Sequence, residues 1–183
     1  MKFLIASDLH GDLHAAKRLL EVFRQQGADR LVLLGDLLYH GPRNDLPAGY
    51  DPKGAIALLN GVKDKILAVR GNCDTEVDQM VLEFPILADY AVIPLSCGAL
   101  AYLTHGHKFN EQTPPPFGKN DVLLHGHSHV AGVTACRDGQ VCLNPGSLSI
   151  PKENTPPCYI LLENSCFVMY RLADGTEYAR VEL

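Results

Sequence analysis

The first half of the chain alternates short aliphatic runs with longer amphipathic stretches. The runs occupy residues 2–6, 31–34 and 66–69. Four consecutive aliphatic residues predict a strand that is buried on both faces. Apolar residues at helical spacing predict a helix from Leu13 to Phe23, capped by Asp12 and followed by Gly27, and a second one from Asp51-Pro52 to Gly61. The order strand, helix, strand, helix, strand predicts parallel strands joined by right-handed crossovers.

The second half has a different pattern, because its apolar runs lie closer together and are separated by turn sequences. A short helix is expected at 76–83. Strands are expected at 91–95, 100–104, 122–124, 132–136, 140–143, 159–162, 166–172 and 177–181. Asp138-Gly139, Asn164-Ser165 and Asp174-Gly175 have the spacing of hairpin turns. The whole pattern predicts an α/β fold with two packed sheets, part parallel and part antiparallel, and helices outside, in a single domain over residues 1–183.

Composition and charge narrow the class of protein. The chain has 183 residues, of which 46% are hydrophobic, enough for a core of its own. The net charge is −5 and the 16 Lys and Arg residues are scattered, so extended nucleic-acid binding is not expected. Only five residues separate Lys2 from Asp8, too few for a signal peptide, and no segment could span a membrane. We therefore expect a cytoplasmic protein whose six cysteines stay reduced.

Polar side chains follow five of the expected strands at the point where each strand ends. All eight histidines lie in the first 129 residues. The strand-end groups are Asp8 and His10, Asp36, Asn72, His105, and His127 with His129. A lone Asp there is usually a turn former, and a lone His is usually a surface residue. The carboxyl ends of parallel strands converge on one crevice, however, so the seven side chains are expected to meet.

Carboxylate, amide and imidazole together suit borderline divalent cations such as Mn²⁺, Fe²⁺, Zn²⁺ or Ni²⁺, and are too rich in histidine for Mg²⁺ or Ca²⁺. Seven ligands are too many for one tetrahedral site. They fit two ions about 3.5–4 Å apart with one bridging carboxylate. The sequence therefore predicts two divalent transition-metal ions, with Mn²⁺ expected ahead of Zn²⁺, Fe²⁺ or Ni²⁺.

Five short motifs in a fixed order resemble a known family. They are Asp8-Leu-His10, Gly35-Asp36, Gly71-Asn72-Cys73-Asp74, His105-Gly-His107 and Gly126-His127-Ser-His129. Asp-x-His and Gly-Asp are weak signals alone, Gly-Asn-x-Asp is moderate and Gly-His-x-His is fairly strong, and in this order on strand ends they are very specific together. The chain resembles the calcineurin-like metallophosphoesterases over essentially its whole length. The His40-to-Asn44 loop and Asn144-Pro-Gly-Ser147 make it most similar to the small single-domain branch of bacteria and archaea.

The resemblance implies a four-layer αββα sandwich of two mixed sheets and a dinuclear metal centre. By position, one metal would be held by Asp8, His10, Asp36 and His129. The other would be held by Asp36, Asn72, His105 and His127, with Asp36 as the bridge. The reaction implied is hydrolysis of phosphate esters, mostly phosphodiesters, with a metal-bridging hydroxide attacking phosphorus in line while Asn72 shares the charge on the phosphoryl oxygens.

One position departs from the family. Cys73 stands where most members have the histidine that stabilises or protonates the reacting ester, and a thiol is a poor general acid. We therefore expect a preference for good leaving groups, such as aryl diesters. Substrate contacts are expected from Cys73, His40, Arg43 and His107, with Arg43 as a phosphate fork. Asp74 is expected either to orient a ligand histidine or to cap the helix that follows.

Two other functions compete with this hypothesis. The same fold serves as a metal-free scaffold in the retromer subunit of eukaryotic trafficking, but here no ligand position is lost. A nuclease or a nucleotide-specific phosphatase could use the same site. The expected partner is a small-molecule phosphate ester, with no membrane partner. The physiological substrate and the oligomeric state, including a homo-oligomer, stay open.

Overall fold

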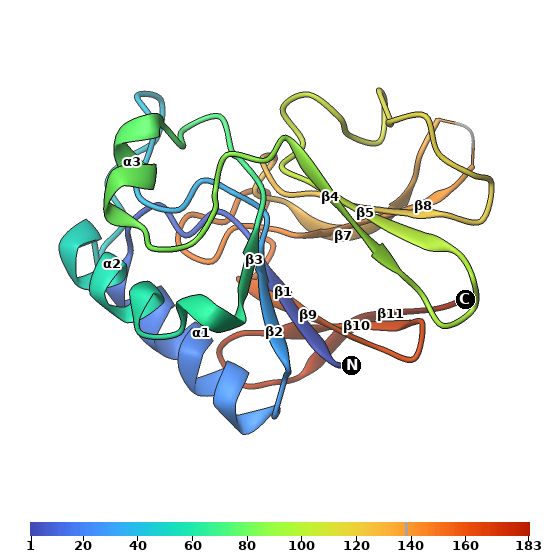
Figure 1. Cartoon of the computed structure of the whole chain (residues 1–183), viewed down its shortest axis with the longest axis horizontal. Coiled ribbons are helices and arrows are strands. Elements are labelled where there is room, and N and C mark those ends of the chain that lie inside the picture. The colour runs from blue at the N-terminus through green and yellow to red at the C-terminus, as the bar shows by residue number, and fades with distance from the viewer. Residues whose placement is uncertain (138) are drawn as a thin grey trace.

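The computed structural model describes residues 1–137 and 139–183, and its centre is a pair of stacked β-sheets (Figure 1). The six-stranded sheet has the order β11-β10-β9-β1-β2-β3, and the five-stranded sheet has the order β4-β5-β6-β8-β7. Strands β1, β2 and β3 pair in parallel, as do β5, β6 and β8. The predicted α/β class with two mixed sheets is confirmed.

The strands and helices lie close to the predicted positions. The first sheet contains β1 (Phe3–Ala6), β2 (Arg30–Leu33), β3 (Ile66–Ala68), β9 (Cys158–Glu163), β10 (Cys166–Arg171) and β11 (Glu177–Glu182). The second contains β4 (Tyr90–Pro94), β5 (Leu100–Thr104), β6 (Val122–Leu124), β7 (Ala131–Ala135) and β8 (Val141–Pro145). The helices are α1 (Leu13–Gln25), α2 (Pro52–Asn60), α3 (Glu76–Val81) and a 3₁₀ turn, η1 (Lys63–Lys65). None of the helices in the described residues is long and apolar enough to cross a membrane.

Helix and turn signals in the sequence explain the local structure. The Asp12 carboxylate accepts the Ala15 amide at 2.9 Å and begins α1, and Gly27 follows its end with φ +60°. The predicted turn at Asn164-Ser165 forms with both residues left-handed, as a two-residue hairpin requires. The predicted turn at Asp138-Gly139 falls on residue 138, which lies outside the described residues.

Three apolar clusters hold the layers together. One joins α1 and α2 to the outer face of the six-stranded sheet, which both helices cover in Figure 1. The second fills the space between the sheets, where Ile5, Val32 and Leu124 are fully buried. On the far face of the five-stranded sheet, Leu123 packs with Tyr102 and Phe117. The segment that covers this face, 105–121, forms a loop in the described structure rather than the helices of the expected fourth layer.

The prediction that all six cysteines stay reduced is wrong for one pair. Cys136 and Cys142 form a disulfide, with their Cα atoms 5.8 Å apart. The β7–β8 hairpin explains this, because its register pairs Thr134 with Cys142 and the Cys136 amide bonds to the Gln140 carbonyl. The sequence shows no compact cysteine framework, so only the strand pairing could have revealed the contact. Cys73, Cys97, Cys158 and Cys166 are free.

Candidate metal centre

The loops that leave β1 and β2 are bonded side by side. Main-chain bonds join the Asp8 amide to the Gly35 carbonyl at 3.1 Å and the His10 amide to the Asp36 carbonyl at 2.9 Å. From the other sheet, the loop after β6 reaches the same place, because the His127 amide donates to Asp8 Oδ2 at 3.0 Å. Strand ends of both sheets therefore meet at one edge, as the sequence predicts.

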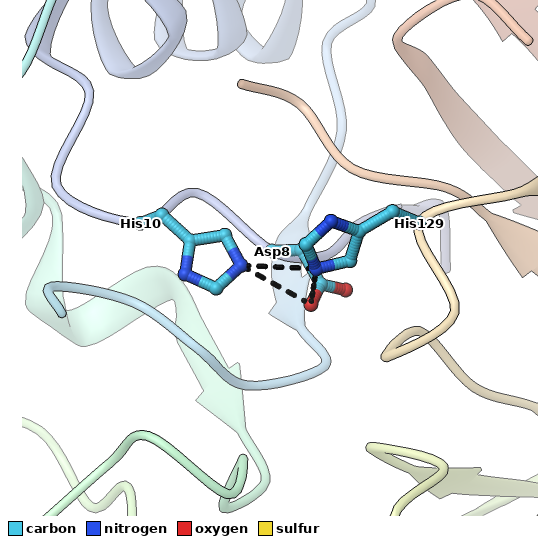
Figure 2. Close-up of side chains that lie close together, drawn as sticks. All are labelled: Asp8, His10 and His129. Atoms are coloured by element: carbon cyan, nitrogen blue, oxygen red, sulfur yellow. Dashed lines mark hydrogen bonds and ion pairs between the residues drawn. The ribbon is translucent and has the colours of Figure 1, made fainter. Parts of the chain in front are cut away.

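Asp8, His10 and His129 form the first group of side chains (Figure 2). Asp8 Oδ1 lies 3.5 Å from His10 Nε2 and 3.1 Å from His129 Nε2, and the two Nε2 atoms are 3.1 Å apart. Each histidine donates its Nδ1 hydrogen to a carbonyl, His10 to Tyr39 at 2.7 Å and His129 to Ile150 at 3.0 Å. The two Nε2 lone pairs therefore face each other and the Asp8 carboxylate. These groups repel one another unless a cation or a proton lies between them.

Asp36, His105 and Asn72 form a second group beside the first. His105 Nε2 lies 3.4 Å from Asp36 Oδ2 and 3.0 Å from Asn72 Oδ1, while its Nδ1 donates to the Leu34 carbonyl at 2.8 Å. Asp36 Oδ2 is also 3.9 Å from His10 Nε2, so this carboxylate stands between the two groups. Its other oxygen accepts the Cys73 amide at 2.8 Å, which fixes the carboxylate plane.

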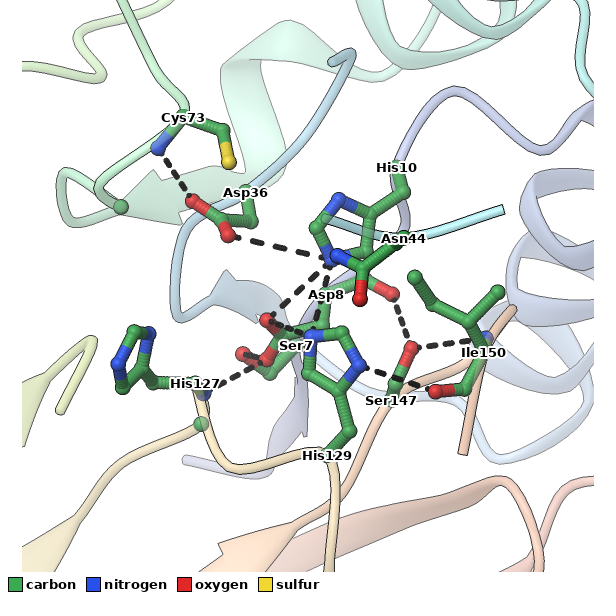
Figure 3. A network of polar contacts seen from close by, with 12 residues as sticks. Ser7, Asp8, His10, Asp36, Asn44, Cys73, His127, His129, Ser147 and Ile150 are labelled. Carbon is green, nitrogen blue, oxygen red and sulfur yellow. Dashed lines mark hydrogen bonds and ion pairs between the residues drawn. The ribbon is translucent and has the colours of Figure 1, made fainter. Parts of the chain in front are cut away.

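Asp8 keeps one oxygen free for an ion. Its Oδ2 accepts the Ser7 hydroxyl at 2.5 Å as well as the His127 amide (Figure 3). Its Oδ1 is buried without a hydrogen-bond partner, which is costly for a carboxylate oxygen. A buried oxygen without a partner, between two imidazole nitrogens, fits a divalent cation.

The charges in the cluster shift one another's pKa values. Burial alone raises the pKa of Asp8, but the charge on His105 and the close approach of the His10 and His129 imidazoles hold it well below its ordinary value. Burial alone lowers the pKa of His105, yet Asp8 and Asp36 raise it to about 9. In the protein without metal, protons on imidazoles therefore balance the two buried carboxylates.

The main chain of the cluster is strained. The residues in the left-handed region are Asp8 (φ +54°), His10 (+48°), Asp36 (+55°), His127 (+66°) and His129 (+62°). Each such residue costs on the order of 1 kcal/mol or more. Glycines allow the close approach of the loops, because a Cβ at Gly71 or Gly126 would overlap the Asp36 or Asp8 carboxylate. These strained residues are therefore ones whose side chains converge in this cluster.

Asp74 has neither of its two expected roles. Its carboxylate accepts the amides of Asp36 at 2.8 Å, Leu37 at 2.9 Å and Gly71 at 2.7 Å. The cap of α3 is Thr75 instead, which forms a capping box with Asp78. Asp74 therefore ties the loop after β3 to the loop that carries Asp36, a role that no local sequence signal indicated.

A cavity of about 350 Å³ opens above these groups. Four predicted ligands line it: Asp36, Asn72, His127 and His129. Cys73 and Arg43 also line it, as expected for substrate contacts, together with Asn44, Ser128 and Lys152. Sequence reasoning missed Lys152, because a lysine in a polar loop carries no signal of its own.

The other predicted residues lie differently. His127 belongs to neither group of side chains, although its ring centroid is 5.1 Å from that of His105. His40 is not among the residues that line the cavity and packs edge-on between Tyr39 and Tyr50. His107 is also outside that lining and lies beside His105, with ring centroids 5.4 Å apart.

Comparison with known proteins identifies the family of the chain. Residues 1–165 match the calcineurin-like phosphoesterase superfamily domain. The chain is 47% identical to the phosphodiesterase YfcE of Escherichia coli K12 over 100% of its own length and 98% of that protein's length. It also superposes on the solved structure of the E. coli phosphoesterase YfcE with a TM-score of 0.93, covering 99% of this chain and 98% of that one.

A more distant structure shares the fold alone. The Vps29 structure from Chaetomium thermophilum has a TM-score of 0.62 at 17% identity, with 99% of this chain and 97% of that chain covered. The full-length match to YfcE agrees with the small branch that the motifs indicated. By its ordered motifs and its family match, the chain belongs to the calcineurin-like phosphoesterase superfamily.

Proposed function

We propose that the protein is a metal-dependent phosphoric ester hydrolase that acts on phosphodiesters. One observation carries this proposal. Asp8 Oδ1 is buried without a partner and faces the Nε2 atoms of His10 and His129, beside a cavity that a small ester can enter. The 47% identity to a phosphodiesterase over the whole chain supports the same reaction class.

The donor set fits a dinuclear centre. Asp8, His10, Asp36 and His129 would hold one ion, and Asp36, Asn72, His105 and His127 the other. Manganese is the first choice of metal. Zinc, iron and nickel are alternatives, because imidazole and carboxylate ligands accept all of these ions. When bound, such ions stabilise charge on phosphoryl oxygens and lower the pKa of water.

The chain's own residues position the ester. The Asn72 amide faces the cavity edge, where it can donate to a nonbridging oxygen, and Arg43 can bind a second oxygen. His105 is assigned a catalytic role because its Nε2, 3.4 Å from Asp36 Oδ2, would hold the second ion beside that carboxylate. Burial, followed by the charge on Asp36, raises the pKa of the Cys73 thiol far above its ordinary value. A thiol is a poor general acid even at its ordinary pKa, which favours esters with good leaving groups.

The proposal also covers the domain organisation of the protein, the size of its substrate, its assembly and its location. Residues 1–183 form one domain, the substrate is a small molecule, and a homo-oligomer is one option for the assembly. The location is cytoplasmic, although the Cys136–Cys142 disulfide is more typical of an oxidising compartment. Acid quenching of whole cells, followed by thiol labelling of the denatured protein, tests this point, since four labelled cysteines per chain would indicate an oxidised pair and six a reduced one.

Asp36→Asn tests the function. We expect loss of at least one metal equivalent and most of the hydrolysis of bis-p-nitrophenyl phosphate, with an unchanged far-ultraviolet circular dichroism spectrum. A metal-free scaffold would contain no stoichiometric divalent ion before the change, and that result would refute the proposal. A panel of cyclic nucleotides, dinucleotides and phosphomonoesters separates a diesterase from a nuclease or a nucleotide-specific phosphatase.

A further inference from the structure

The cavity above the metal centre has two cationic side chains in its wall, Arg43 and Lys152. Neither of them forms an ion pair, and the lysine and arginine ion pairs within the described residues all lie elsewhere. The protein as a whole carries a net charge of −5. The protein is acidic overall, but this cavity has two cationic side chains without a carboxylate partner among the described residues. These side chains attract anions to the cavity.

The main chain of Lys152 is fixed to a predicted metal ligand. The Lys152 amide donates to the His129 carbonyl at 2.9 Å. Figure 3 shows the neighbouring bond, in which His129 Nδ1 donates to the Ile150 carbonyl at 3.0 Å. Thr155 closes the turn, because its amide and hydroxyl both donate to the Lys152 carbonyl, at 3.0 and 2.9 Å. The loop that carries Lys152 is therefore positioned by the same histidine that faces Asp8.

The two residues after Lys152 show that this turn is held in place. Glu153 and Asn154 both adopt left-handed conformations, with φ of +52° and +58°. Non-glycine residues adopt this conformation uncommonly, and here the hydrogen bonds from Thr155 to the Lys152 carbonyl close the turn around them. Lys152 is exposed and lines the cavity, so its side chain is accessible both to solvent and to a ligand that enters.

A second tight turn carries Arg43. Gly41 is left-handed at φ +81°, the Asn44 amide bonds to the Gly41 carbonyl at 3.5 Å, and Asn44 Nδ2 donates to the His40 carbonyl at 2.8 Å. Asp36 is the one carboxylate in the described lining of the cavity, and its oxygens already face His105 and the Cys73 amide. Neither cation therefore has a carboxylate partner within the cavity.

We propose that Lys152, beside the Arg43 contact to the scissile phosphate, forms a subsite for a second anionic group of the substrate. The subsite rests on the proposed function, since it selects among phosphodiesters. The favoured substrate is a diester whose substituent carries a carboxylate or a phosphate in addition to the scissile phosphate. A hydrogen bond between an ammonium and an anionic oxygen is about twice as strong as a neutral one, so the Lys152 ammonium can make this subsite selective for an anionic substituent.

A pair of matched diesters tests the subsite. Bis(4-carboxyphenyl) phosphate and bis(4-carbamoylphenyl) phosphate have the same shape, and only the first carries extra negative charge on both substituents. The measured quantity is the ratio of their kcat/KM values, acid over amide, in manganese-loaded protein. We expect Lys152→Ala to lower this ratio about tenfold, Lys152→Arg to keep it, and added salt to reduce it in the wild type.

Lys17 provides the control, because it is exposed on α1 and away from the cavity. Lys17→Ala should leave the ratio unchanged. An equal loss on both diesters in Lys152→Ala, or an unchanged ratio, overturns the subsite. If the wild type hydrolyses neither diester, the proposed function fails instead. Calorimetric binding of the same two diesters then decides whether Lys152 selects the anionic one.

Discussion

The substitution Gly126→Ala tests whether the position of Asp8 is set by the packing of the loop after β6. A methyl group there would lie closer than 3.0 Å to both Ser7 Oγ and Asp8 Oδ2. These two atoms are already joined by a 2.5 Å hydrogen bond, so neither can move without the other. Restoring ordinary contact displaces the Asp8 carboxylate by roughly 1 Å, and a displacement of that size costs about 100-fold in a catalytic site. Forced overpacking also destabilises a protein by about 1–3 kcal/mol.

We therefore expect Gly126→Ala to lose at least about tenfold in metal affinity, in line with other changes next to a ligand, and most of its activity. Isothermal titration with Mn²⁺ and hydrolysis of bis-p-nitrophenyl phosphate measure the two effects. Gly132→Ala in β7 is the matched control, because nothing lies within 4 Å of the added methyl and neither glycine is left-handed. Metal affinity within twofold of the wild type in Gly126→Ala would show that Asp8 tolerates displacement, and the steric reasoning would be wrong.

Three further predictions follow from other contacts. In protein stripped of metal, the His105 imidazolium adds stability that is complete below pH 6.5 and lost as pH rises through its pKa of about 9. Urea unfolding with a chelator should therefore show a loss on the order of 3 kcal/mol, and a flat profile contradicts the ion pairing. Cys73→His should make kcat/KM less sensitive to leaving-group pKa across a series of aryl diesters, and an equally steep dependence would show that the added imidazole does not protonate the leaving group. Ser147→Ala removes the 2.8 Å hydrogen bond to the Asp8 carbonyl and should lower the unfolding free energy by about 1–3 kcal/mol, measured by chemical denaturation. Unchanged stability would mean that this bond does not hold the loop.

Much of the fold could be predicted from the sequence because its signals are local. The aliphatic run 31–34 needs burial on both faces, and Asp12, Asp51 and Gly27 mark helix ends by their own chemistry. The convergence of the candidate ligands follows from a general rule, since parallel strands present their carboxyl ends at one edge. A prediction that depends on neighbours in sequence, or on sheet direction alone, can be made without coordinates.

The features that sequence reasoning missed depend on contacts between distant segments. Asp74 binds amides 37 and 38 residues away, and nothing near Asp74 in the sequence identifies them. The Cys136–Cys142 disulfide follows from a strand register, and Lys152 enters the cavity because His129 anchors its loop. In each case the partner is chosen by tertiary packing, which local patterns do not encode.

The strain in the cluster bears on how the site is held before any ion binds. Five left-handed residues together cost several kcal/mol, which is a large part of a typical domain's stability. The hydrogen bonds that oppose this cost come from the protein: the paired loops after β1 and β2, the three amides on Asp74, and the Ser147 hydroxyl on Asp8. Because these bonds need no cation, the geometry of the candidate ligands is preorganised, and an ion that binds there would mainly have to displace protons from imidazoles. Metal affinity should therefore rise with pH, since each imidazole must be neutral to bind.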